Sequence, residues 1–346
     1  EAGLYVMCNP ASYGGSGASP AAYADVVETL AKADASVGWC TFIAITSAFH
    51  IATAGTDAIR DLLRTKGVKT AGVFAPNGRA RRAEENGSPG YLVNGRWAWG
   101  SGSQNADWIT GGAFVVDDSG ELIRGSDGQP QNIGMVFPAK DVRFHDTWKV
   151  MGLQGTGSTD FEVKNLFVPI DRTVAGFGDR SDDAPIFRFP SFGMLAIGIG
   201  SVALGATRGA IDDLITLASE KTPVGSRSKL SEKSETQRLL ARAEATVRSG
   251  RAFLREAIDE AWSSALMGPI SVTDRRNLRL ATNHAVYSAR TAIGLVHELA
   301  GGSSVYRNST IQRRFRDVHV ASLSIGVQTG PPIGAQKGPP FTMAQG

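Results

Sequence analysis

Cysteine is scarce in this sequence, and charge of one sign is not in excess. Two cysteines, Cys8 and Cys40, occur in 346 residues, which excludes a disulfide framework. No group of Cys and His residues has the spacing of a zinc site, so we expect no metal ion. The 36 Lys and Arg residues and the 33 Asp and Glu residues are interspersed and give a net charge of +3. The basic patch of a nucleic-acid-binding protein is therefore missing, and we expect no nucleic acid as a partner.

Long apolar runs are missing as well. No uninterrupted stretch of about 18 apolar residues occurs, and the N-terminus lacks a basic segment followed by an apolar one. We therefore expect no membrane span and no export, and we place the protein in the cytoplasm. The first residue is Glu1 and not Met, so we expect that a leading segment precedes this chain.

Glycine, by contrast, is abundant. The chain holds 41 glycines, which is about 12% where ~7% is typical, and they fall in discrete patches without a G-X-Y period. A chain of this length buries a sizeable core. We therefore expect special backbone geometry at these patches and not disorder.

The residue pattern changes twice along the chain, and the three resulting regions predict an α+β fold. Residues 1–67 have helical spacing of apolar residues. Residues 68–175 alternate short β-rich runs with turn residues, and residues 186–328 return to the helical period. Residues 329–346 are rich in Pro, Gly and Gln, and we expect an irregular tail there.

The middle region predicts an antiparallel sheet or barrel and not βαβ units, because its β-rich runs follow one another closely. The runs are residues 72–74, 91–93, 108–110, 113–116, 135–137 and 165–169. Asn94-Gly95 directly follows one run, which is a strong signal for a hairpin turn.

Four long helical segments predict a bundle in the last region. They span Met194–Leu217, Ser231–Met267, Val272–Leu299 and Thr310–Val327. The first contains glycines at 198, 200, 205 and 209, a spacing that predicts close approach of neighbouring helices.

Two motifs and two shorter signals carry a family resemblance. The motifs are Tyr91 to Gly102 (YLVNGRWAWGSG) and Trp148 to Asp160 (WKVMGLQGTGSTD), and the shorter signals are GGS at 301–303 and RRFRD at 313–317. In this order they resemble the acyl-CoA dehydrogenase superfamily over nearly the whole chain. The resemblance implies an N-terminal helical domain, a central antiparallel β-barrel or sandwich domain, and a C-terminal four-helix bundle.

The first motif suits a flavin wall. Glycines let a backbone approach a flat ring, while hydroxyl and amide groups complement its polar edge. The resemblance places Trp99, Gly100 and Ser101 against the flavin ring. An ordinary hairpin with aromatic packing is the alternative.

In the second motif we choose Thr156, Ser158 and Thr159 as flavin-binding candidates, with a simple turn as the alternative. The absence of a G-K-[ST] ending excludes a Walker-type phosphate loop.

Arg227 and the Gly301-Gly302 pair are the remaining cofactor candidates. The resemblance implies that a basic residue at the position of Arg227 reaches a flavin phosphate across a subunit boundary, and Arg suits phosphate through its forked geometry. The glycine pair resembles a turn that contacts the neighbouring subunit's cofactor. We therefore expect a homo-oligomer, in particular a homotetramer. For Arg227, a solvated surface residue is the alternative.

The positions of the family's carboxylate base decide between two chemistries. An acyl-CoA dehydrogenase removes a proton with a Glu that lies either about eight residues after the Arg-Asp pair or early in the first bundle helix. Here those positions hold Ser324 or Ile325, and Ala196. The sequence thus lacks a carboxylate base for the dehydrogenation of an acyl-CoA at both expected positions.

The other branch consists of two-component monooxygenases, which receive reduced flavin from a separate reductase. They form a flavin C4a-hydroperoxide with O2 and hydroxylate a small aromatic or polyketide-like substrate. The segment Ala33–Trp39 followed by His50, together with the form of the first motif, favours this branch. FMN and FAD stay equally open as the cofactor.

We choose His50, Ser324 and His319 as catalytic candidates. His50 is our first choice for a substrate-side acid or base, with a buried structural His as the alternative. Many hydroxylase relatives have a His where Ser324 stands, so altered or lost activity stays open. The two other functions considered are an FAD-dependent acyl-CoA dehydrogenase with an atypical base and a non-catalytic flavin-binding or ligand-binding scaffold.

Overall fold

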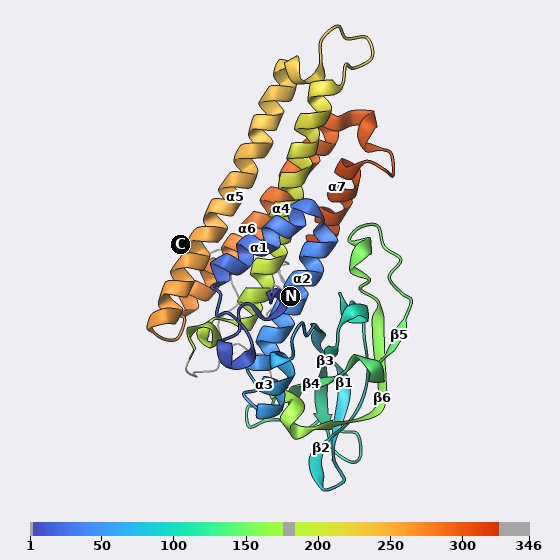
Figure 1. The fold of residues 1–346 in the computed structure, drawn as a ribbon, viewed down its shortest axis with the longest axis vertical. Coiled ribbons are helices and arrows are strands. Elements are labelled where there is room, and N and C mark those ends of the chain that lie inside the picture. The colour runs from blue at the N-terminus through green and yellow to red at the C-terminus, as the bar shows by residue number, and fades with distance from the viewer. Residues whose placement is uncertain (1–2, 176–183, 325–346) are drawn as a thin grey trace.

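The protein combines a helical bundle with a mixed β-sheet. The computed structural model describes residues 3–175 and 184–324; the predicted tail at 329–346 lies outside them. The bundle helices run along the long axis of the molecule, and the sheet lies at one end (Figure 1). The described helices are α1 (Pro20–Ala33), α2 (Ala35–Ala52), α3 (Asp57–Arg64), α4 (Ser191–Glu220), α5 (Ser234–Met267), α6 (Val272–Ala300) and α7 (Thr310–Ala321).

The first three helices begin at side-chain caps. The Ser19 hydroxyl accepts from the Ala22 amide at the start of α1, and Thr56 caps α3. Asp34 ends α1 in an extended conformation, and its carboxylate accepts from the first amides of α2. Because such caps satisfy amides that have no partner inside the helix, a single residue separates α1 from α2.

The sheet has seven strands in the order β5-β6-β2-β1-β3-β4-β7. The antiparallel arrangement that we predicted holds for five of the six strand pairs in the described residues, whereas β1 and β3 run parallel. Strands β5 and β7 form open edges of this sheet, so it does not close into a barrel. The strands are β1 (Thr70–Glu85), β2 (Ser88–Trp97), β3 (Trp108–Val116), β4 (Asn132–Pro138), β5 (Arg143–His145), β6 (Asp160–Pro169) and β7 (Thr173–Ala175).

The hairpin turn that we predicted at Asn94-Gly95 is wrong, because both residues lie inside β2. The turn between β1 and β2 is instead Asn86-Gly87, where both residues have positive φ (51° and 78°), as a tight two-residue turn requires. Asn94 pairs across the sheet, with its side chain accepting from the Asn165 amide. The register with β6 shifts next to Gly95, so this glycine marks a bulge.

Glycines gather around one fully buried tryptophan of the sheet. Side chains at Gly78 and Gly111 would come within 2.7 and 2.6 Å of the Trp97 ring, and Gly95 has no room for one either. The indole Nε1 of Trp97 donates to the carbonyl oxygen of Gly112, 2.8 Å away. Part of the glycine excess thus allows backbones to close over a large aromatic ring.

The four bundle helices confirm the predicted segments, and α4 lies at their centre. The glycines of α4 allow the close approach that we predicted: Gly198 faces Phe42 of α2 and Tyr23 of α1, and Gly205 lies against the backbone of Glu28. The end predicted for the last segment, residues 325–327, lies outside the described residues.

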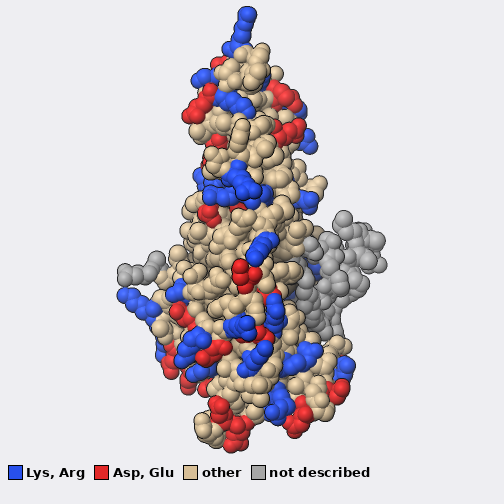
Figure 2. Space-filling model, turned by 90° about the vertical axis from the view of Figure 1, so that its right-hand side faces the viewer, with Lys and Arg blue, Asp and Glu red and all other residues tan. Residues whose placement is uncertain are grey.

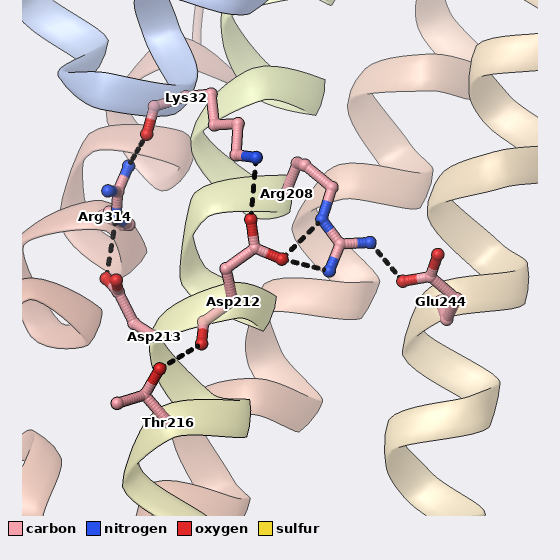
Figure 3. A network of polar contacts seen from close by, with 7 residues as sticks. All are labelled: Lys32, Arg208, Asp212, Asp213, Thr216, Glu244 and Arg314. Atoms are coloured by element: carbon pink, nitrogen blue, oxygen red, sulfur yellow. Dashed lines mark hydrogen bonds and ion pairs between the residues drawn. The ribbon is translucent and has the colours of Figure 1, made fainter.

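Ion pairs connect the helices near the middle of the bundle (Figure 3). Asp212 of α4 accepts from Arg208 at 2.6 Å and lies 2.9 Å from Lys32 of α1. Arg208 also pairs with Glu244 of α5. These side chains are a quarter to a half exposed, so each pair adds little stability.

A second pair in Figure 3 is more deeply buried. The Arg314 side chain is 9% exposed, and its Nε donates to Asp213 Oδ2 at 3.0 Å. Its Nη1 donates to the carbonyl oxygen of Lys32, 2.6 Å away. Gly209 leaves room for the guanidinium group. Arg314 therefore connects α7 to both α4 and α1.

Within the described residues, two helices are long and apolar enough to cross a membrane, by length and composition alone. Residues Ala35–Ala52 have a mean hydropathy of 1.4 and are 72% buried, and the window in Ser191–Glu220 has a mean hydropathy of 1.5 and is 89% buried. Their positions inside the fold account for their apolar character. On the face shown in Figure 2, Lys and Arg side chains alternate with Asp and Glu side chains and form no patch of one sign.

Candidate functional site

The two sequence motifs meet in the structure. The amide of Gly100 donates to the carbonyl oxygen of Thr159 at 3.0 Å, and the amide of Gly102 donates to that of Thr156 at 3.1 Å. Both segments lie at the end of the sheet that faces α2, and the Gly102 backbone lies near Cys40 of that helix. The structure therefore brings together the two groups of flavin-binding candidates.

Three predicted residues join in a chain of hydroxyl groups. The Ser101 and Ser158 oxygens lie 2.6 Å apart, and the Ser158 and Thr156 oxygens also lie 2.6 Å apart. At one end, Trp39 Nε1 donates to Ser101 at 3.0 Å; at the other, Thr156 donates to the carbonyl oxygen of Leu153 at 2.8 Å. All three hydroxyl-bearing residues are buried. We had not predicted the part that Trp39 plays, because only the folded chain brings α2 to Ser101.

Trp99 is unusual in both exposure and backbone. Its side chain is 73% exposed, and its φ is 65°, a conformation that costs non-glycine residues free energy and often occurs at binding sites. Behind it, a side chain at Gly100 would come within 2.7 Å of the Phe161 ring. An exposed flat ring thus stands beside a closely packed backbone.

Thr159 differs from the other candidates. Its hydroxyl donates to the carbonyl oxygen of His145 and accepts from the Thr147 amide at 3.2 Å. These bonds connect it to the segment around β5, away from the hydroxyl chain. Its role as a cofactor contact stays a prediction. Its observed contacts support the alternative, in which this residue stabilises a simple turn.

A cavity of about 430 Å³ lies between α2 and the two motifs. Its lining from the motifs is Ser101, Gly102, Asn105 and Gly155, and its lining from elsewhere is Tyr5, Asp34, Ser36, Val37, Cys40, Thr41, Ala44, Lys69 and Thr70. A volume of this size lies in the range of small-molecule sites.

Helix α7 holds the second motif in place. The Leu153 amide donates to Asp317 Oδ1 at 2.6 Å, and Arg316 donates to the carbonyl oxygen of Met151. Leu153 has a φ of 52°, and Gly152 lies directly against the backbone of Arg316. Burial raises the pKa of Asp317, although the Leu153 amide acts in the opposite direction. Asp317 was part of the resemblance only, and no local sequence signal indicated this contact.

His50 does not line the cavity. It lies six residues beyond Ala44, the last residue of α2 that lines the cavity, a distance of ~9 Å along the helix axis. Its ring packs edge-on against Phe74 with ring centroids 4.5 Å apart. Burial lowers its pKa to about 4. Its placement favours the structural alternative over the role of a substrate-side acid or base.

We expect His50 to make the fold acid-sensitive. Its pKa is lower in the folded state than the ordinary value of 6.5, so the unfolded chain binds a proton first, and stability falls as the pH drops from 6.5 towards 4. The free energy of unfolding should decrease by about 2 kcal/mol by pH 5, measured by urea unfolding. In the His50→Gln variant this component should be missing; an equally steep decrease in that variant would contradict the assignment.

His319 and Ser324 also lie outside the cavity lining. The His319 ring lies tilted against Phe315 with centroids 4.1 Å apart, and its Nδ1 lies within hydrogen-bond distance, 2.7 Å, of the Phe315 carbonyl oxygen. Both of these contacts lie within α7 itself. Ser324 is half-buried just beyond α7, at the last described position before residue 325. Their catalytic roles stay predictions that the geometry does not support.

Arg227 belongs to the loop between α4 and α5, and Gly301 and Gly302 to the turn between α6 and α7. Both segments lie at the end of the bundle away from the sheet (Figure 1). Arg227 is exposed in the loop between α4 and α5. Lys221, at the start of the same loop, donates to the carbonyl oxygen of Ala300 at 2.8 Å and so lies beside the glycine pair. Their roles as cofactor contacts across a subunit boundary stay predictions.

The described residues contain no metal centre. Within 3–175 and 184–324, no three His, Cys, Asp or Glu side chains gather closely enough to hold a metal ion. The carboxylate that lines the cavity, Asp34, accepts from the Ser36 and Val37 amides at 2.8 and 3.2 Å. Its Oδ1 is thus occupied as the cap of α2.

Comparison with known proteins agrees with this architecture. The sequence matches the acyl-CoA dehydrogenase N-terminal domain over residues 1–65 and the C-terminal domain over residues 197–329. It is 32% identical to an indole-3-acetate monooxygenase of Pseudomonas putida, over 92% of this chain and 79% of that protein. A pigment production hydroxylase of a Rhodococcus species is 30% identical, over 93% and 82%.

Solved structures show the same fold. XiaF from a Streptomyces species, in complex with FADH2 and glycerol, has a TM-score of 0.84 at 23% identity, covering 94% of this chain and 82% of its own. Butyryl-CoA dehydrogenase from Megasphaera elsdenii has a TM-score of 0.75 at 18% identity, covering 92% and 82%.

The fold and the domain matches define a flavoprotein oxidoreductase, and the chain belongs to the acyl-CoA dehydrogenase family. Within that family its relatives are flavin-dependent monooxygenases, and the chain belongs to this branch. The family resemblance and the three-part fold predicted from the sequence are thereby confirmed.

Proposed function

We propose that this chain is the oxygenase component of a two-component system, which uses reduced FMN or FAD and O2 to hydroxylate a small aromatic or polyketide-like molecule. The observation that carries the proposal is the cavity between α2 and the two motifs, with the hydroxyl group of Ser101 on its wall. A separate flavin reductase would supply the reduced cofactor, as in the resorcinol hydroxylase relative, whose name describes an oxygenase component.

The residues at the cavity fit a flavin. The exposed ring of Trp99 offers a flat apolar face, Gly100 allows close approach, and Ser101 offers a polar group for the edge of the ring. When bound and reduced, flavin supplies the electrons that activate dioxygen. Trp99, Gly100 and Ser101 would hold the ring of the flavin at this site.

The cavity lining indicates what kind of substrate the site takes. Val37 and Ala44 contribute apolar surface, while Thr41, Thr70 and Lys69 contribute polar groups. A ring with hydroxyl or carboxylate substituents matches this mixture better than a purely apolar one. The named relatives act on such molecules, indole-3-acetate and resorcinol. Burial of the substrate against α2 would also exclude water during the reaction.

A dehydrogenase function fits the site less well. Such an enzyme needs a carboxylate that is free to remove a proton. Asp34 is occupied as the cap of α2, and its Oδ2 lies 3.7 Å from Arg313. The loss of the family's base at Ser324 and Ala196 therefore has no replacement among the cavity-lining residues.

The assembly is a further part of the proposal. Arg227 and the Gly301-Gly302 pair would reach the flavin of a second copy, so that a homotetramer completes the cofactor sites. Apolar side chains beside this region, Val224, Val305 and Tyr306, are at least 69% exposed, which suits an interface between copies. We also propose a cytoplasmic location, where flavin reductases are available.

One experiment tests the reaction class. The protein is mixed with chemically reduced FMN or FAD, isotopically labelled dioxygen and a set of phenolic and indolic acids. Label in a hydroxylated product supports the proposal. Bleaching of tightly bound oxidised FAD by an acyl-CoA, without label transfer, would show a dehydrogenase, and failure to bind either flavin would show a scaffold.

A further inference from the structure

The chain of hydroxyl groups has a direction. A hydroxyl has one proton to donate. Thr156 gives its proton to the carbonyl oxygen of Leu153, so it must accept in its contact with Ser158. Ser158 then donates to Thr156, and Ser101 must donate to Ser158. The direction is fixed by the carbonyl group at the end, which can only accept.

This direction leaves no hydroxyl proton for the cavity. Ser101, the member of the chain that lines the cavity, donates to Ser158 and accepts from Trp39 Nε1. Its second lone pair is all that it can offer to a ligand. A ligand group that donates a hydrogen bond therefore meets a ready acceptor.

A ligand group that accepts a hydrogen bond requires the donor–acceptor order of the three hydroxyl groups to reverse. Thr156 would donate to Ser158, Ser158 to Ser101, and Ser101 to the ligand, while Trp39 could still donate to Ser101. The reversal removes the bond from Thr156 to Leu153, so the complex contains one hydrogen bond fewer. One net hydrogen bond corresponds to about a fivefold difference in affinity.

We infer that Thr156 sets the preference of this site for reduced over oxidised flavin. The inference rests on the proposed function, in which the flavin ring edge meets Ser101. Reduction converts the N5 nitrogen of the ring from an acceptor into an N–H donor, so the two redox states need opposite partners at the same edge. Thr156 is a positioning residue, because it contacts Ser158 and Leu153 and acts on the ligand through Ser101.

The Thr156→Val variant tests this assignment. Val has a similar shape but no hydroxyl, so Ser158 loses its acceptor and turns its proton to Ser101, which then donates into the cavity. The ratio of the two dissociation constants, measured by anaerobic titration with reduced and with oxidised FMN and FAD, should change by about fivefold in favour of oxidised flavin. Thr156→Ser restores the hydroxyl and should restore the ratio of the unaltered protein.

Trp39→Phe provides the matched control. It removes an N–H group from the same chain but leaves the carbonyl of Leu153 at the other end, so the chain keeps its direction. Affinity for both flavin forms should change equally, and their ratio should stay constant. Ser158→Ala gives a second test that does not touch Leu153: it interrupts the chain and should shift the ratio in the same direction as Thr156→Val.

The outcomes separate this inference from the proposed function. If the unaltered protein binds neither form of flavin, the proposed function fails. If it binds flavin but both Thr156→Val and Ser158→Ala keep the original ratio, the proposed function stands and the role of Thr156 is wrong. A changed ratio in Trp39→Phe would likewise show that the direction of the chain does not control the preference. Circular dichroism confirms that each variant is folded.

Discussion

Replacing Asp317 with Ala is expected to lower the hydroxylation rate by about a hundredfold, because a displacement of ~1 Å at a reacting centre has effects of this size. Asp317 accepts from the Leu153 amide, and Leu153 holds a left-handed conformation that needs such support. Without it the second motif relaxes, and Thr156 and Ser158 leave the positions that align Ser101. Product formation at saturating reduced flavin measures the effect.

Two variants define what Asp317 does. Asp317→Asn keeps an oxygen that accepts from Leu153 and removes a charge whose burial is unfavourable, so it should retain most activity and at least the original stability. Arg313→Ala alters the same helix at a half-exposed residue 3.7 Å from Asp34 and should have little effect. Equal loss of activity in the Asn and Ala variants would show that the charge matters and not the hydrogen bond.

Replacing Arg314 with Ala is expected to lower the free energy of unfolding by about 3 kcal/mol, because it leaves Asp213 and the partly buried carbonyl oxygen of Lys32 without this partner. Arg314 is the connection from α7 to α4 and α1 that Figure 3 shows. Urea unfolding followed by circular dichroism measures the change.

The control for Arg314 is an ion pair of similar geometry at the surface. Arg238 and Glu235 lie 2.6 Å apart on α5, and both are more than 60% exposed. Arg238→Ala should leave the unfolding midpoint unchanged. Comparable destabilisation by both variants would mean that burial does not account for the effect of Arg314.

Sequence patterns predicted the helices well because their signals are local. The segment predicted as Val272–Leu299 is observed as Val272–Ala300, where a Ser271 cap and an apolar period agree. The parallel pairing of β1 with β3 could not be predicted, since it depends on contacts between residues such as Thr70 and Trp108. The same holds for the turn, because Asn94-Gly95 and Asn86-Gly87 have the same local signal and only pairing with β6 distinguishes them.

Prediction of the site succeeded for residue types and failed for their connections. Ser101, Thr156 and Ser158 were chosen individually, and the structure joins them. The links at either end, Trp39 and the carbonyl of Leu153, come from segments whose proximity only the fold creates. His50 was chosen for its chemistry, but it lies almost two helical turns beyond Ala44, the last residue of α2 that lines the cavity.

The buried position of α4 also has a consequence for the synthesis of the protein on the ribosome. Its apolar surface is covered by α1 and α2, which are synthesised before it, and by α5, α6 and α7, which are synthesised after it. Until α6 is complete, this 30-residue helix, apolar enough to cross a membrane, lacks α6 and α7, two of its five helical partners. Nascent chains of this protein should therefore depend on ribosome-associated chaperones between the synthesis of α4 and that of α6.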